Sequence, residues 1–416
     1  MKQKLLLLFF FNGSWFFNAY SLEVNSKNIK SLIEQKNVRI SASEWQIQAA
    51  KEREGILARS FFPSVKLSAA QENFTTGQNR NKTQPIYGIE GDINLFNAGK
   101  DKIESEIRDT TTRVQATYNQ QTIYTELQKA RSYYWEILYL KSKKDILTAA
   151  IEINKSNSLA AERRIKSGVA TQTDRVEFEM EAINLQRELQ LTDVQFKNNI
   201  NMLKITLNLE ESENFEFQEV LVHEHDFETM MNHTVKDFEF SFKDAELNAK
   251  INSLQSDKQR RAIWPRVDAF ASYYQYNQRE KDFLSAIDRD EYTVGIKVTI
   301  DIPAGLESNR DAAAYHYQAK SAQNLAIIRR REIETHLKNE MNELNYLHDQ
   351  VHNAEENIKH AEKYYRLTQS EYNRGVKNSP DVLGASQRLL AMRHKRLEIV
   401  KDFQLSKGHI LSQLGK

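Results

Sequence analysis

The chain has 416 residues, and its 58 Lys and Arg against 57 Asp and Glu leave a formal net charge of +1 at pH 7. Nucleic-acid-binding proteins usually carry a clustered basic excess, so this balance gives no support for a nucleic-acid partner. The sequence contains no cysteine, which excludes a disulfide framework, a thiolate metal site and a lipid-modified N-terminal cysteine.

The low content of turn-forming residues predicts long secondary-structure elements. The chain has 5 Pro and 13 Gly. A charged fraction of 28% and a mean hydropathy of −0.66 are typical of solvent-exposed helices rather than of a compact enzyme core. Disorder is the competing interpretation, and the regular apolar spacing of the chain argues against it.

The first 21 residues have the three parts of a secretory signal peptide. Lys2 and Lys4 precede an apolar run at 5–11, and Ala19 and Ser21 supply small side chains at the −3 and −1 positions of a cleavage site near Ser21. The apolar run is short for a membrane anchor, which is the alternative. No later stretch reaches the roughly 18 apolar residues of a spanning helix, so an exported chain that enters a membrane is expected to do so as a barrel.

Residues 22–209 form the first of two predicted repeats. A helical pattern comes first, two alternating strands follow, and a long helical hairpin with its tip near residue 168 completes the repeat. The first arm of the hairpin has sparse apolar positions spaced by threes and fours over about 70 residues, or about 100 Å, which is typical of a coiled-coil-like helix. The predicted bounds are about 28–60 for the first helix, 63–74 and 86–96 for the strands, 75–84 for the polar loop between them, and 99–209 for the hairpin.

A connector with short elements is predicted at 210–236, and residues 237–416 then repeat the same order. Pro63 and Pro265 are 202 positions apart, whereas Gly168 and Gly375 are 207 apart. The difference falls in or beside the loop between the strands, where insertions are tolerated best. This agreement of spacing indicates an internal duplication. The predicted bounds are about 237–262 for the helix, 265–276 and 291–302 for the strands, and 305–415 for the hairpin with its tip near residue 375.

The four predicted strands have the length and alternation of strands that cross a membrane. Each has about ten residues with one apolar, aromatic face, and the other face carries charges that suit a wet lumen. A small soluble sandwich with one buried face is the alternative. Four strands cannot close a membrane barrel, which needs about eight, so several chains would have to share one. The charged positions are Glu90, Asp92, Lys297 and Asp301.

Several short motifs occur in a fixed order along the chain. The first motif is Asn37 with residues 58–63, which follow it and precede a strand. The second is 95–99 at a strand-to-helix junction, and the third is 261–268. The last combines Tyr372-x-x-Gly375, residues 381–383 and a terminal Leu414-Gly415. Together they resemble the TolC-like outer-membrane efflux proteins along nearly all of the mature chain. The resemblance implies a mainly α fold with a transmembrane β part, in which three copies give four strands each to a shared twelve-stranded β-barrel that an α-helical barrel continues.

The resemblance also implies a function and a location. It implies an outer-membrane channel of a Gram-negative bacterium, with its helical part in the periplasm, that is the passive exit duct of a tripartite efflux or type I secretion system. The implied partners are the other copies of a homotrimer, outer-membrane lipid, a periplasmic adaptor (membrane fusion) protein and an inner-membrane transporter. It implies no enzyme activity and no cofactor, and it leaves the cargo open among drugs, metal ions and secreted proteins.

Four residues near the tips match family positions that close the periplasmic mouth. Asp174 and Tyr372 match positions that link neighbouring helices, and Lys377 matches a basic position that is Arg in the best-known member. Asp381 matches an acidic ring at the narrowest point, so three copies would form a cation-selective constriction. Helix N-capping, worth about 1 kcal/mol, is the other interpretation of Asp381. Gly384 departs from the family pattern, because a second acidic residue is expected there, and this predicts a single ring with weaker cation binding.

The turns at the two tips are expected to dock the adaptor. Gly168 and Gly375 are expected to be turn glycines, and each is followed by a valine, Val169 and Val376. Only the second tip carries a tyrosine, Tyr372, and a Pro-Asp pair, Pro380-Asp381. We therefore expect the second hairpin to be the one that moves.

A zinc hydrolase and a periplasmic coiled-coil adaptor are the rival interpretations. His348 and His352 have the spacing of a metalloprotease helix, but Asp349 stands where the catalytic Glu is expected and no third ligand is evident. The simpler interpretation is that these are surface histidines without a metal site. The same interpretation applies to His223 and His225 of the connector, for which weak metal binding is the alternative. An adaptor has a single helical hairpin and more short strands than the four predicted here.

Overall fold

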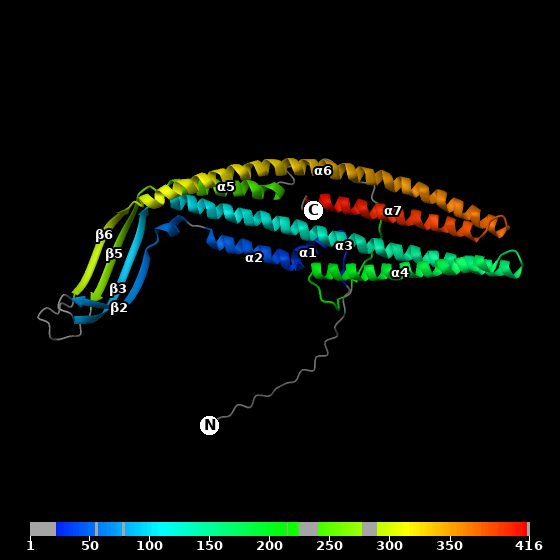
Figure 1. The fold of residues 1–416 in the computed structure, drawn as a ribbon, viewed down its shortest axis with the longest axis horizontal. Coiled ribbons are helices and arrows are strands. Elements are labelled where there is room, and N and C mark those ends of the chain that lie inside the picture. The colour runs from blue at the N-terminus through cyan, green and yellow to red at the C-terminus, as the bar shows by residue number, and fades with distance from the viewer. Residues whose placement is uncertain are drawn as a thin grey trace, which may run out of the picture. The chain divides into compact units, whose positions relative to one another are not determined.

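The chain repeats one order of elements: a helix, two strands and two long helices. The computed structural model describes residues 22–54, 57–76, 80–213, 215–223, 240–276 and 289–413 (Figure 1). The predicted signal peptide, residues 224–239 and the terminal Leu414-Gly415 lie outside these ranges. The first set comprises α1 (Ile29–Lys36), α2 (Val38–Arg53), the 3-10 turn η1 (Leu57–Phe61), β2 (Ser64–Thr76), β3 (Arg80–Phe96), α3 (Lys100–Lys166) and α4 (Gln172–Thr206). The second set comprises α5 (Phe240–Arg260), β5 (Arg266–Tyr276), β6 (Arg289–Thr299), α6 (Ile302–Asn373) and α7 (Ser379–Gln413).

The first helical segment is interrupted at Asn37. The expectation of one helix over about 28–60 is wrong, because Asn37 adopts an extended backbone with φ −73° and ψ 119° between α1 and α2. Its buried side-chain amide donates to Glu126 Oε2 at 3.0 Å and to the Thr206 carbonyl at 2.8 Å. A buried amide needs such partners, and these two fix the chain where the helix breaks.

The long helical arms occur in both halves. The first arms, α3 and α6, have 67 and 72 residues, and the second arms, α4 and α7, have 35 each. Helix α6 begins at Ile302, slightly before the predicted start at about 305, with Pro303 in its first turn. Proline is tolerated there because its missing N–H would have no partner within the helix.

One antiparallel sheet has the strand order β2-β3-β5-β6, so β2 and β6 are its edges. The polar loop expected at 75–84 is mostly strand, because β2 and β3 pair from Ser64↔Asp92 as far as Thr76↔Arg80. Backbone hydrogen bonds continue the ladder regardless of side-chain polarity. Among the described residues, β5 joins β3 from Ile86 onwards, and Pro85 pairs there with Gln71 of β2. Strand β6 ends at Thr299, before the predicted end at about 302.

The register places the apolar side chains of all four strands on one face. Tyr273 of β5 lies opposite Ile89 of β3 on one side and Tyr292 of β6 on the other. Many of these side chains are strongly exposed, with Leu67 at 78% and Tyr292 at 80%. The opposite face is polar, and there the Tyr274 hydroxyl donates to Glu90. The predicted alternation is confirmed, and the chain on its own leaves the apolar face uncovered.

The chain divides into two compact units that cut across the sequence repeats. The first unit contains 1–38, 123–232 and 339–416, and the second contains 39–122 and 233–338. The sheet belongs to the second unit and both hairpin tips belong to the first. In the connector, β4 (Phe215–Glu216) pairs in parallel with β1 (Leu22–Glu23) in the first unit. In the described part of the chain, no helix is both long and apolar enough to cross a membrane.

Candidate functional site

The two hairpin tips have the same backbone turn. Gly168 and Gly375 have φ values of +74° and +81°, the left-handed conformation that residues with a Cβ rarely adopt. In the first tip the Val169 N–H donates to the Arg164 carbonyl at 3.0 Å, and in the second the Val376 N–H donates to the Glu371 carbonyl at 2.9 Å. These are the bonds of a glycine-terminated helix, so the duplication extends to individual hydrogen bonds.

The residues after the glycines are exposed and the two tips are neighbours. Val169 and Val376 are 60% and 70% exposed. A Cβ placed on Gly375 would lie 3.9 Å from Val169 Cγ1, which is ordinary van der Waals contact. The two turns therefore present two adjacent apolar side chains to solvent.

Asp174 joins α4 to α7. Its Oδ2 accepts the backbone N–H of Thr171 at 2.8 Å and the Thr171 hydroxyl at 3.0 Å, which caps the start of α4. Its Oδ1 accepts the hydroxyl of Ser379 at 2.5 Å, from the first residue of α7. Burial alone would raise the Asp174 pKa, but the hydrogen bonds from Ser379 and Thr171 outweigh it and hold that pKa below its usual range. The carboxylate is therefore ionised at neutral pH.

Asp381 and Lys377 lie at the start of α7. Asp381 Oδ2 accepts the Asn378 backbone N–H at 3.2 Å, and Asn378 Oδ1 in turn accepts the Asp381 N–H at 3.4 Å. This reciprocal pair caps the helix. Lys377 Nζ lies 3.8 Å from Asp381 Oδ1, and both side chains are about 40% exposed, so their attraction is weak. The capping interpretation of Asp381 is confirmed, and its carboxylate also faces solvent.

Tyr372 is held by an arginine of the other hairpin. The Arg164 guanidinium lies 4.0 Å from the centre of the Tyr372 ring, and its Nη1 donates to the Tyr372 carbonyl at 2.5 Å. The Tyr372 side chain is 2% exposed, and its hydroxyl has no hydrogen-bond partner in the part of the chain that the structure describes. Arg164 lies in the last turn of α3 and Tyr372 in the last turn of α6, so this pair joins the first arms of the two hairpins.

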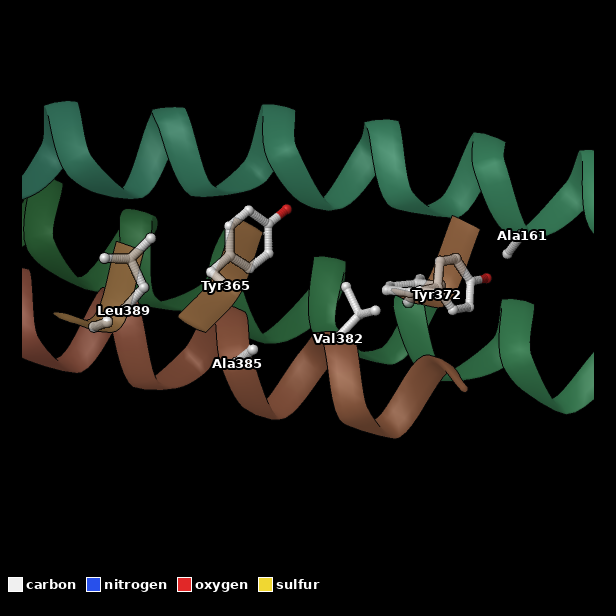
Figure 2. Packing of buried hydrophobic residues seen from close by; sticks show 8 residues of the cluster. Ala161, Tyr365, Tyr372, Val382, Ala385 and Leu389 are labelled. Atoms are coloured by element: carbon white, nitrogen blue, oxygen red, sulfur yellow. The ribbon is translucent and has the colours of Figure 1, made fainter. Parts of the chain in front are cut away.

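A buried apolar cluster lies directly behind the tips (Figure 2). Tyr372 lies between Ala161 of α3 and Val382 of α7, and Tyr365 lies one layer further from the tip. Phe178 is the member that α4 contributes, so all four long helices supply side chains to this cluster. Tyr365 also accepts a hydrogen bond from Asn157 at 3.4 Å. The members of this tip cluster are Ala161, Phe178, Ala361, Tyr365, Tyr372, Val382, Ala385 and Leu389.

Sequence reasoning missed Arg164 and Ser379, although a signal for them existed. The bonded pairs are separated by nearly the spacing of the repeat: Arg164 and Tyr372 by 208 positions, and Asp174 and Ser379 by 205. The spacing between the turn glycines is 207. Equivalent positions of the two hairpins therefore lie side by side. Among the four predicted gate residues, the described structure pairs only Lys377 with Asp381 directly.

The histidines of two sequence motifs also come together. His348 Nδ1 lies 3.0 Å from His223 Nε2, and the His223 ring centre lies 4.7 Å from that of Phe403. His225 lies outside the described residues. No group of three or more potential ligands within the described ranges is arranged to hold a metal ion.

Comparison with known proteins gives one family and several related structures. The model of a family described as "Outer membrane efflux protein" matches residues 30–204 and 239–406. No curated protein matches the chain in sequence. Among solved structures, CusC, described in connection with transmembrane channel formation, is 12% identical with a TM-score of 0.80, over 93% of this chain and 91% of that one.

Two further structures are similar over nearly the whole chain. The outer membrane protein VceC of Vibrio cholerae is 12% identical with a TM-score of 0.79, over 94% of this chain and 95% of that one. The CmeC outer membrane channel of Campylobacter jejuni is 15% identical with a TM-score of 0.73, over 94% and 85%. The fold expected from the sequence motifs is confirmed.

Proposed function

The chain belongs to the outer membrane efflux protein family, and from this premise we propose that it is the exit duct of a tripartite efflux or type I secretion system, closed at its helical tips. Family membership makes it an outer-membrane efflux channel. The observation that supports a gate at the tips is the pair of links Asp174–Ser379 and Arg164–Tyr372, which tie both arms of one hairpin to both arms of the other. Such a channel is a conduit, and its energy comes from a partner pump.

Three copies of the chain complete the channel. The sheet has two open edges, β2 and β6, and unpaired edges cannot face lipid. Three sheets joined edge to edge give twelve strands in one barrel, with the apolar face toward lipid.

Helix α4 supports the same assembly. It has an exposed apolar stripe whose members are three, four or eight positions apart, which places them on one side of the helix and favours helix-to-helix packing. A second copy that packs on this stripe would bury it. The stripe consists of Val176, Met180, Ile183, Leu191, Val194, Met202 and Ile205.

The tips form the gate and the docking surface. Asp174 and Tyr372 are links, and Lys377 and Asp381 line the mouth, where three copies bring three Asp381 carboxylates together as a cation-selective ring. The turns at 168–169 and 375–376 present exposed valines to a periplasmic adaptor, which connects the duct to an inner-membrane transporter. The helices with these tips lie in the periplasm.

Fractionation tests this assembly directly. A trimer in the outer-membrane fraction, resolved on an unheated gel, is expected, whereas a soluble periplasmic monomer contradicts the proposal. Ile183→Asp places a charge in the stripe and is expected to abolish the trimer. Asn184→Asp adds the same charge to an exposed position about 100° further around the helix and is expected to leave the trimer intact.

A further inference from the structure

A pocket of about 880 Å³ is lined by α2, η1 and residues 108–115 of α3 in the second unit. Figure 1 shows α2 and α3 side by side in this part of the molecule. The charged side chains of the lining are Arg53, Arg59, Arg108 and Glu52. Three guanidinium groups against one carboxylate give the lining a net positive charge, which favours an anion.

Arg108 has unused hydrogen-bonding capacity at this pocket. Its Nε is buried and has no hydrogen-bond partner in the described structure. Its Nη1 lies 3.7 Å from Glu104 Oε1, a loose pair between successive turns of α3. A buried charged donor without an acceptor is costly, and the Arg108 side chain, which is 29% exposed as a whole, can turn this donor toward an acceptor supplied from outside the chain.

The surroundings of the pocket indicate where that acceptor comes from. Ser60 lines the pocket, and its carbonyl accepts the side-chain amide of Asn94 in β3 at 3.3 Å, so the pocket adjoins the helical end of the sheet. The neighbouring Phe61 and Phe62 are 44% and 71% exposed, and Trp264, just before β5, is 58% exposed. Aromatic residues at the end of an apolar sheet mark the level of the membrane–water interface.

We propose that this pocket binds the phosphate of an anionic phospholipid headgroup. The inference rests on the proposed position of the sheet in the outer membrane. Arginine forks pair with phosphate oxygens through two parallel hydrogen bonds, and the volume accommodates a headgroup larger than phosphate alone. The site would anchor the channel at the level where its sheet gives way to helices.

Native mass spectrometry of the full-length protein, purified in a neutral detergent, tests this site. Phosphatidylglycerol, the zwitterionic phosphatidylethanolamine and inorganic phosphate are added separately. The wild-type protein is expected to retain phosphatidylglycerol preferentially. The double variant Arg53→Gln with Arg108→Gln is expected to weaken that binding at least tenfold, because it removes two charged donors to the phosphate.

The control is Arg113→Gln, which removes one positive charge, against two in the double variant, from an exposed position of α3 outside the pocket. Equal phosphatidylglycerol binding by the double variant and the control overturns the inference. Competition by millimolar inorganic phosphate would identify a free-phosphate site and overturn the lipid assignment. The same spectra also report the oligomeric state. A trimer that binds no lipid selectively refutes the lipid site and leaves the proposed channel function standing. A monomer contradicts the proposed function itself.

Discussion

The guanidinium of Arg164 lies 4.0 Å from the centre of the Tyr372 ring and donates to the Tyr372 carbonyl at 2.5 Å. The two residues are 208 positions apart, so this contact holds the first arms of two separate hairpins together. The Ser379 hydroxyl donates to Asp174 and joins the second arms of the same two hairpins. In the proposed gate, opening of the tips breaks both contacts.

Replacement of Arg164 is expected to loosen the tips. Arg164→Gln removes a cation–π contact worth about 0.5–2 kcal/mol and a charged hydrogen bond worth about 1.5–3 kcal/mol. Hydrogen exchange of the amides around 160–176 and 365–383 is expected to accelerate by about tenfold or more. Arg163→Gln, which changes the exposed neighbour in the same last turn of α3, serves as the control and is expected to leave exchange unchanged.

The Asp174 link is expected to depend on pH. Because the Asp174 pKa is lower in the folded protein than its ordinary value of about 3.9, the link stabilises the tips fully above that value. Its contribution is lost as the pH falls through the lowered pKa. Bilayer conductance is therefore expected to rise on acidification below about pH 4. Asp174→Asn is expected to conduct more at pH 7 and to lack the acid-dependent step, and an acid response identical to wild type would count against this assignment.

Two glycine-to-alanine substitutions are expected to have opposite effects. Gly375→Ala keeps ordinary contact with Val169 but places a Cβ at φ +81°, which costs about 1–2 kcal/mol. Gly384→Ala lies inside α7, where a new Cβ meets nothing within 4 Å, and is expected to stabilise by about 0.5–1 kcal/mol. The temperature at which the proposed trimer dissociates should therefore be lower than wild type for Gly375→Ala and higher for Gly384→Ala. Equal shifts would show that the turn does not require glycine.

Substitutions at Asp381 can separate helix capping from charge. Asp381→Asn keeps an oxygen that can accept the Asn378 N–H but removes the carboxylate from the proposed ring. Reversal potentials in a salt gradient are expected to show reduced cation preference with a normally folded trimer. Asp381→Glu keeps the charge and is the matched control. Unchanged selectivity in Asp381→Asn would restrict Asp381 to capping.

The architecture of this chain could be predicted because the sequence contains an internal duplication, so each element is indicated by two independent patterns. Gly168 and Gly375 recur at one spacing and take the same turn, and strand alternation placed Leu67 and Tyr292 on an apolar face. Family membership also decides against the rival adaptor interpretation. The helix break at Asn37 could not be predicted, since its cause is a buried amide bonded to Glu126 and Thr206, far away in sequence.

The links between the tips were predicted only in part. Asp174 and Tyr372 were selected by resemblance, whereas Arg164 and Ser379 are common residues on polar helices with no local pattern. Their roles depend on which positions face each other across hairpins. The repeat spacing contained that information, because partners lie about one repeat apart.

Single-channel conductance of the double variant Arg164→Gln with Asp174→Ala, in planar bilayers at neutral pH, is the most direct test of a gate at the tips. This variant removes both links and leaves the sheet and the α4 stripe unchanged. Conductance is expected to rise severalfold above wild type, and above either single variant. Trimers of the double variant that insert normally but conduct like wild type would contradict a gate held by these two contacts.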